Sequence, residues 1–133
     1  MAATNPYATY KQKAMNTTSP GELTLMLYNG CLKFIKRAEQ AIENKNIEGQ
    51  NLNLIKAQDI IRELMVTLKT DSEVGQNMLR VYDFILSRLV DANVNGDLKA
   101  LKEAEEFVTE FRDTWKEVLI IDRKARHGEG GQA

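Results

Sequence analysis

The sequence predicts an all-α fold: an antiparallel up-down-up-down four-helix bundle with an N-terminal arm and a disordered C-terminal tail. Both prolines, Pro6 and Pro20, lie before residue 21, so no proline interrupts a helix in the remaining chain. From there on, apolar residues recur at helical spacing, and few runs alternate with the period of a strand. Short polar breaks separate the apolar segments, and short connections make consecutive helices antiparallel neighbours.

The composition and the breaks in this pattern divide the chain into three parts. Residues 1–18 are polar, and Pro6 disfavours helix at Asn5, so we expect a flexible N-terminal arm. Residues 19–121 carry the helical pattern and form the expected bundle, which by its length is one domain. Residues 122–133 are rich in glycine and in charged residues, which is typical of a disordered tail.

The first helix is expected over residues 20–44, and a strong start signal precedes it. The Ser19 hydroxyl can accept a hydrogen bond from the Glu22 amide, and the Glu22 carboxylate can accept one from the Ser19 amide. Pro20 suits the first helical position, where an amide N–H would have no partner. The apolar arc of this helix covers roughly 220°, whereas a surface helix needs only roughly 100°. A helix of this width must contact neighbours on several sides.

The second helix is expected over residues 47–69, with Asn46 as its cap, and the third over residues 73–94. Each has a core stripe at three-and-four spacing and further apolar positions outside that stripe. The further positions are Leu52, Ile55 and Val66 on the second helix, and Leu79, Phe84, Leu86 and Val90 on the third.

The fourth helix is expected over residues 98–120, after a turn at Asn95-Gly96 and with Asp97 as its cap. Its apolar residues form a narrow seam of the kind that packs in a bundle. The expected core stripes extend to the helix ends, where they include Ile47, Val74 and Val118.

The charge balance and the scarcity of histidine and cysteine argue against several classes of function. Lys plus Arg number 18 and Asp plus Glu number 19, so a net charge of −1 offers no attraction for a nucleic acid. The only histidine, His127, lies in the expected tail, which argues against catalytic triads and histidine-rich metal sites. The single cysteine, Cys31, lies in an apolar run and is interpreted as a buried hydrophobe. We therefore expect no enzyme, no cofactor and no metal.

The sequence also predicts where the protein resides. Residues 1–18 lack the continuous apolar region of a signal peptide. No apolar run approaches the roughly 20 residues that are needed to span a bilayer. We therefore expect a cytoplasmic protein that does not insert into a membrane.

The apolar positions in excess of one stripe per helix are the remaining functional signal. Contacts with two neighbours can explain the wide first helix, but they explain the line on the second helix poorly, because it lies opposite its own core. Exposed grooves of this kind usually bind another chain, either a copy of the protein or an amphipathic segment of a partner. Helical geometry assigns the groove to Tyr28, Leu52, Ile55, Val66, Phe84 and Leu86.

Several stretches of the chain carry a family resemblance. They are NPYATY (5–10), SPGELTLMLYNGCLKFI (19–35), LIKAQDIIREL (54–64), LRVYDFILSRLVDAN (79–93) and VTEFRDTWKEVL (108–119). Together they resemble the FliS family of flagellar secretion chaperones, most closely the Bacillus type, in order and without large gaps over about residues 5–120.

This resemblance implies a cytoplasmic four-helix bundle that binds the disordered C-terminal segment of flagellin. Such a chaperone keeps flagellin unpolymerised and delivers it to the flagellar type III export gate. The resemblance also implies that the N-terminal arm covers part of the binding surface in the absence of flagellin. Tyr7 and Tyr10 match the tyrosines that are implicated in docking to the gate and in gating the groove. The alternative is a homo-oligomeric bundle, for example a homodimer, or a regulatory protein.

Overall fold

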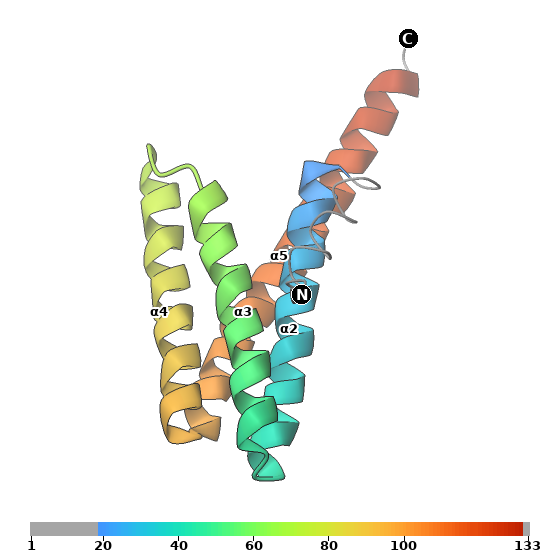
Figure 1. Cartoon of the computed structure of the whole chain (residues 1–133). Coiled ribbons are helices and arrows are strands. Elements are labelled where there is room, and N and C mark those ends of the chain that lie inside the picture. Colours follow the sequence, from blue (N-terminus) through green and yellow to red (C-terminus); the bar gives the residue numbers. More distant parts are fainter. Residues whose placement is uncertain (1–18, 132–133) are drawn as a thin grey trace, which may run out of the picture.

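The structure, a computed structural model, describes residues 19–131, with side chains described as far as residue 126. Its helices are α2 (Pro20–Glu43), α3 (Ile47–Thr67), α4 (Glu73–Asn95) and α5 (Leu98–Gly131) (Figure 1). No strand occurs within this described part of the chain. The expected N-terminal arm, residues 1–18, lies outside the described residues.

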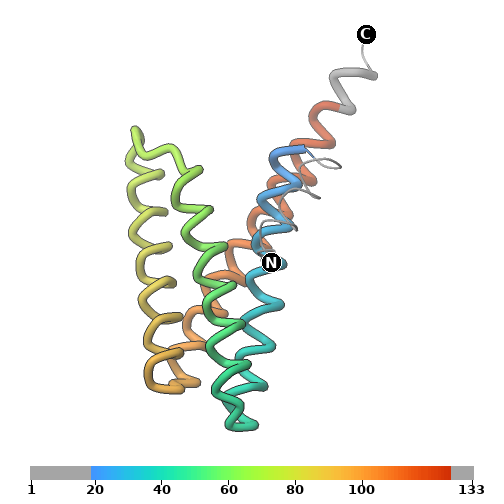
Figure 2. The backbone as a smooth tube through the Cα atoms, viewed as in Figure 1, coloured from blue at the N-terminus to red at the C-terminus, as the bar shows by residue number. Residues whose placement is uncertain are grey.

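The four helices form a ring. Helix α2 contacts α3 and α5, and α4 also contacts α3 and α5. Because every connection is short, each helix runs antiparallel to both of its neighbours in the ring. The tube in Figure 2 shows this course, with the C-terminal end of α5 extending beyond the other helices. The predicted up-down-up-down bundle is confirmed.

The predicted start of the first helix is confirmed in its main feature. The amide of Glu22 donates a hydrogen bond to the Ser19 hydroxyl over 3.3 Å, and Pro20 occupies the first turn. The Glu22 carboxylate also lies 3.6 Å from the guanidinium of Arg123. The N-terminus of α2 is therefore attached to the C-terminal half of α5 as well as capped locally.

Helices α3 and α5 start at the predicted caps, Asn46 and Asp97, and α4 starts at a cap that was not predicted, Ser72. Asn46 accepts from the Gly49 amide at 3.0 Å, Ser72 from the Gly75 amide at 3.0 Å, and Asp97 from the Ala100 amide at 3.1 Å. Between α4 and α5, Gly96 has φ 61°, a left-handed conformation that glycine adopts without steric cost. These side-chain bonds satisfy amides that have no partner within their own helix.

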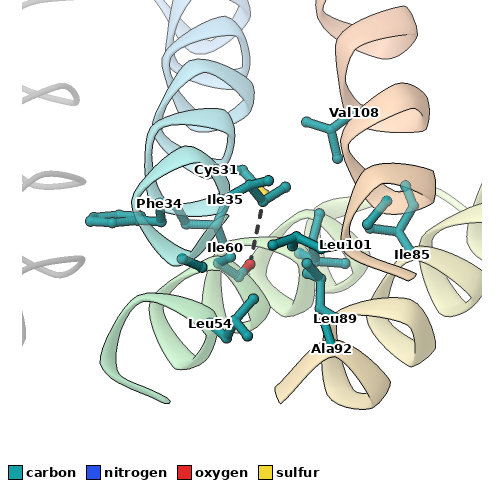
Figure 3. Close-up of a cluster of buried hydrophobic side chains, with 14 of the residues drawn as sticks. Cys31, Phe34, Ile35, Leu54, Ile60, Ile85, Leu89, Ala92, Leu101 and Val108 are labelled. Atoms are coloured by element: carbon teal, nitrogen blue, oxygen red, sulfur yellow. Dashed lines mark hydrogen bonds between the residues drawn. The ribbon is translucent and has the colours of Figure 1, made fainter. Parts of the chain in front are cut away.

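The core lies along the axis of the bundle and receives apolar side chains from all the described helices (Figure 3). Its largest fully buried side chains are Ile35, Leu54, Ile60, Ile61, Ile85, Leu89, Leu101 and Val108. All of these lie on the stripes that the three-and-four spacing predicts. Helical phase alone is therefore sufficient to identify the central layers.

The predicted core stripes are wrong at the helix ends. Ile47, Val74 and Val118 are exposed, and Val74 retains 69% of its accessible surface. Each has the helical phase of a core residue but lies in a terminal part of the bundle, where fewer neighbours surround it. Phase determines the direction of a side chain, whereas burial also requires a neighbouring helix at that height.

The structure differs from the sequence-based expectation at the C-terminal end, where α5 continues to Gly131. The stretch that we expected to be a disordered tail from residue 122 onward is therefore helical as far as Gly131. Arg, Lys and Ala between residues 123 and 126 are good helix formers, and Asp122 pairs with Arg126 one turn later. The expectation gave too much weight to the glycines, the first of which in this stretch is Gly128.

Replacing Gly75 with alanine should destabilise the bundle by about 1–3 kcal/mol, the usual cost of overpacking. A Cβ atom at this position would lie 1.9 Å from the Lys69 carbonyl oxygen, so the α3–α4 connection would have to move. Urea unfolding followed by circular dichroism measures the loss. Val74→Ala is the matched control in the same turn and should change stability by less than about 0.5 kcal/mol. Equal stabilities of the two variants would contradict the prediction.

Candidate partner-binding surface

A surface groove lies between α3 and α4. It has a volume of about 290 Å³ and is lined by Arg62 of α3 and by Asp83, Leu86, Ser87, Val90 and Asp91 of α4. Leu86 and Val90 are one helical turn apart and provide its apolar part. The groove therefore combines an aliphatic strip with charged groups of both signs, as expected for a seat of an amphipathic segment.

Helix α3 also has an exposed apolar edge. Leu52, Ile55 and Val66 retain 52%, 44% and 80% of their accessible surface. Their spacing with Asp59 and Arg62 follows steps of three and four, which places all of them along one face of α3. Because Arg62 lines the groove, this face borders it. Leu52, Ile55 and Val66 thus lie on the same exposed face of α3 as Arg62, whereas Leu86 lines the groove itself.

Two residues of α4, Val90 and Val94, extend this surface, although the sequence-based list of groove residues does not include them. Val90 lines the groove and Val94 is exposed one turn later. The signal for both was present, because Leu86, Val90 and Val94 recur at intervals of four and lie along one line of α4.

Phe84 lies on a different edge of the molecule. Its ring contacts that of Phe107 on α5, with centroids 5.5 Å apart and an angle of 75° between the planes. The guanidinium of Arg88 lies 5.6 Å from the Phe84 centroid and pairs with Asp91 and, over 3.7 Å, with Glu103 of α5. Phe84 is therefore half of an aromatic contact between α4 and α5, and it does not line the groove between α3 and α4.

The assignment of Tyr28 to the groove is corrected by its burial. Tyr28 is only 3% exposed, and its hydroxyl lies 2.6 Å from that of Tyr82 on α4. The Phe111 ring packs against both tyrosines. Burial raises the pKa of both phenols, so both stay protonated. Tyr28 has the helical phase of an interior residue, and α4 provides the hydroxyl that makes its burial possible.

Tyr7 and Tyr10, the two candidates in the arm, lie outside the described residues. Their assignment stays a prediction from the family resemblance.

Charges around the groove form short local pairs. Arg62 lies 3.3 Å from Asp59 on its own helix, and Arg88 pairs with Asp91. All these groups are partly or largely exposed, so each pair contributes at most about 1 kcal/mol to stability. A partner with charged side chains can therefore exchange one of these pairs at low cost.

Within the part of the chain that the structure describes, no cluster of His, Cys, Asp and Glu could hold a metal ion. No described helix is both long enough and apolar enough to cross a bilayer.

Cys31 lies fully buried in the core beside the backbone of α3, with its Sγ atom 3.9 Å from the Ala57 carbonyl oxygen (Figure 3). Burial raises the pKa of the Cys31 thiol from 9.0 to about 12. The reactive thiolate is therefore almost absent in the folded protein at neutral pH.

The buried thiol should be protected from alkylation, and it should make folding sensitive to alkaline pH. Because its pKa is higher in the folded state, its stabilising contribution is complete below about pH 9 and is lost between about pH 9 and 12. Iodoacetamide labelling at pH 8, with and without urea, measures the protection. The Cys31→Ala variant should lose stability less steeply between pH 9 and 10. If iodoacetamide labelled Cys31 in the folded protein as fast as a free thiol, the predicted protection would be contradicted.

Comparison with known proteins agrees with the fold and with the sequence motifs. The family model described as flagellar protein FliS matches residues 3–122. The chain is 55% identical over 133 residues to the flagellar secretion chaperone FliS of Bacillus subtilis (strain 168), with both chains covered in full. It is 33% identical over 112 residues to the corresponding chaperone of Escherichia coli (strain K12), with 82% of each chain covered.

A solved structure gives an independent comparison of the fold. A crystal structure of a flagellar chaperone from bacteria superimposes with a TM-score of 0.70, covering 85% of this chain and 94% of that chain. At 19% sequence identity this likeness concerns the fold alone. With the family model matching most of the chain, the conclusion is direct: this protein is a member of the FliS family of flagellar proteins.

Proposed function

We propose that this protein is a cytoplasmic flagellar secretion chaperone that binds the disordered C-terminal segment of flagellin. In this role it prevents premature polymerisation of flagellin and delivers it to the flagellar type III export gate. The observation that carries the proposal is the 55% identity over the full length to a flagellar secretion chaperone. The relatives' function is chaperoning, and no catalytic activity is proposed for this chain.

The groove between α3 and α4, with the exposed edge of α3, is the proposed docking surface for flagellin. Leu52, Ile55, Leu86 and Val90 provide an apolar strip that an amphipathic segment could cover. At roughly 25 cal/mol per Å², burial of a few hundred Å² contributes several kcal/mol. The ordering of a disordered segment consumes part of this, which keeps the complex reversible for handover at the export gate.

Isothermal titration calorimetry with a synthetic C-terminal flagellin peptide tests this proposal. We expect binding with a Kd in the micromolar range or tighter, which corresponds to about 8 kcal/mol or more. A negative heat-capacity change should accompany it, because apolar surface is buried. No binding at tens of micromolar peptide would overturn the proposal.

Docking to the export gate is a finer part of the same proposal. Tyr7 and Tyr10 would dock the loaded chaperone to the export gate, and Tyr10→Ala should then alter export without unfolding the bundle.

A homodimer is the alternative use of the exposed apolar residues, among them Val118 and Ile121 of α5. Sedimentation over a wide concentration range distinguishes a dimer from a monomer.

A further inference from the structure

A heptad seam runs along one face of α5 and continues beyond the part that packs within the chain. Its positions follow each other in steps of four and three: Phe107, Phe111, Thr114, Val118, Ile121 and Ala125. The ring of Phe107 contacts Phe84 of α4, with centroids 5.5 Å apart. The ring of Phe111 contacts Tyr82 of α4 at the same distance. The first half of the seam therefore packs against a helix, and the second half repeats its pattern.

No helix of the described chain covers the second half of the seam, which we call the free seam (residues 114–125). Val118 and Ile121 retain 44% and 59% of their accessible surface. Thr114 and Ala125 are exposed as well. At 1.5 Å per residue, the free seam is about 17 Å long. It is therefore an accessible helix face of more than three turns.

The free seam is open because α4 and α5 separate toward this end of the bundle. Figures 1 and 2 show the C-terminal part of α5 leading away from the start of α4. Val74, in the first turn of α4, accordingly retains 69% of its accessible surface. On another side, α5 stays attached to α2, because the Trp115 indole N–H donates a hydrogen bond of 2.8 Å to the Gly21 carbonyl. A fixed helix pair therefore presents the free seam.

The charges beside the free seam match a second copy of it that runs in the opposite direction. When Val118 packs against Ile121 of the other copy, each Glu117 lies opposite Lys124 of the other copy, twice by symmetry. Neither residue has an ion-pair partner among the described residues, nor an opposite charge three or four residues away on its own helix. A parallel pair would bring Glu117 near Asp122 of the other copy, and these charges repel. The charge pattern therefore favours the antiparallel arrangement.

The other charges at this end of the molecule leave the match intact. Those closest to the free seam are paired within the chain: Asp113 with Arg112, Asp122 with Arg126, and Arg123 with Glu22. Lys116 lines a groove between α2 and α5, on another side of the helix. Asp71 and Glu73 belong to the start of α4, across the gap. Glu110 comes opposite Gly131 of the other copy, which carries no charge.

We propose that the free seam is a self-recognition surface through which two copies of this chain form a reversible antiparallel dimer. Val118 and Ile121 of both copies form its two central layers, and two pairs of Glu117 with Lys124 lie along one edge. Because the seam is short, the dimer buries less than the roughly 1,200 Å² of a standard interface and is weak. It gives the alternative homodimer a defined interface, and it does not rest on flagellin binding.

Sedimentation equilibrium of the full-length protein tests the association, and we expect a monomer–dimer equilibrium. Ile121→Glu should raise the dimer Kd at least tenfold, because it removes a carboxylate from water in a central layer. Ile120→Glu is the matched control, since Ile120 is also exposed but lies on another side of α5, in the groove toward α2. It should change the Kd less than twofold. With both variants folded by circular dichroism, equal effects, or a wild-type protein that stays monomeric at millimolar concentration, would overturn the proposal.

Exchange of the charges tests the antiparallel register. Glu117→Lys places lysines opposite each other, and Lys124→Glu places carboxylates opposite each other, so each variant should dimerise about tenfold more weakly at low salt. A mixture of the two variants restores both opposite-charge pairs, and the mixed dimer should form about as tightly as the original. Lys116→Glu, the control next to Glu117, should change the Kd less than twofold. Absence of a preference for the mixed dimer would contradict the proposed register and overturn the proposal.

The flagellin surface is tested separately from the dimer. The flagellin peptide should bind Ile121→Glu within twofold of its original affinity when the protein concentration is below the dimer Kd. A failure of either proposal is therefore seen independently of the other. If saturating flagellin peptide dissociated the dimer, the free seam would belong to flagellin, and self-recognition would be ruled out as its role.

Discussion

The Leu89→Ala variant should lose about 2–5 kcal/mol of unfolding free energy, the range for removing a leucine side chain from a closely packed interior. Leu89 is fully buried in α4, in the layer that also contains Ile85 and Leu101 (Figure 3). The cavity would lie at the centre of the bundle, where all helices contribute to the core and none can move inward alone. Urea unfolding followed by far-ultraviolet circular dichroism measures the difference.

Leu52→Ala provides the control for this prediction. It removes the same atoms from a side chain that is about half exposed, on the outer face of α3. Its effect on stability should stay below about 0.5 kcal/mol. If the two variants were equally stable, Leu89 would not be part of a closely packed core.

The Ile55→Glu variant should bind the flagellin peptide at least tenfold more weakly, which corresponds to about 1.4 kcal/mol. Ile55 is 44% exposed beside the groove between α3 and α4, so the free protein tolerates a carboxylate there. In the complex, that carboxylate would be removed from water against an apolar partner surface, and its desolvation is not compensated. Calorimetry on the folded variant measures the loss.

Ile121→Glu is the matched control for this variant. Ile121 is also exposed and aliphatic, but it lies on α5, away from the groove between α3 and α4. The affinity of Ile121→Glu should be within twofold of the original. A loss in Ile121→Glu as large as in Ile55→Glu would place the flagellin surface elsewhere. Retained affinity in Ile55→Glu would remove the α3 edge from that surface.

The sequence determined the features that depend on interactions over a few residues. The predicted caps at Ser19, Asn46 and Asp97 involve atoms at most three residues apart, and the core phase follows from the helical repeat. The family is also identified by contiguous motifs, which do not depend on how the helices pack. Local hydrogen bonds and periodicity explain why these predictions are confirmed.

The tertiary structure decided which apolar side chains are accessible. Tyr28 is buried because Tyr82 provides a hydroxyl from α4, and Phe84 lies at the α4 edge because Phe107 of α5 is beside it. The groove between α2 and α5 combines residues about 90 positions apart, such as Met26 and Lys116. The exposure of a side chain depends on whether another helix packs against that side of its own helix at the same level of the bundle. No local sequence pattern contains that information.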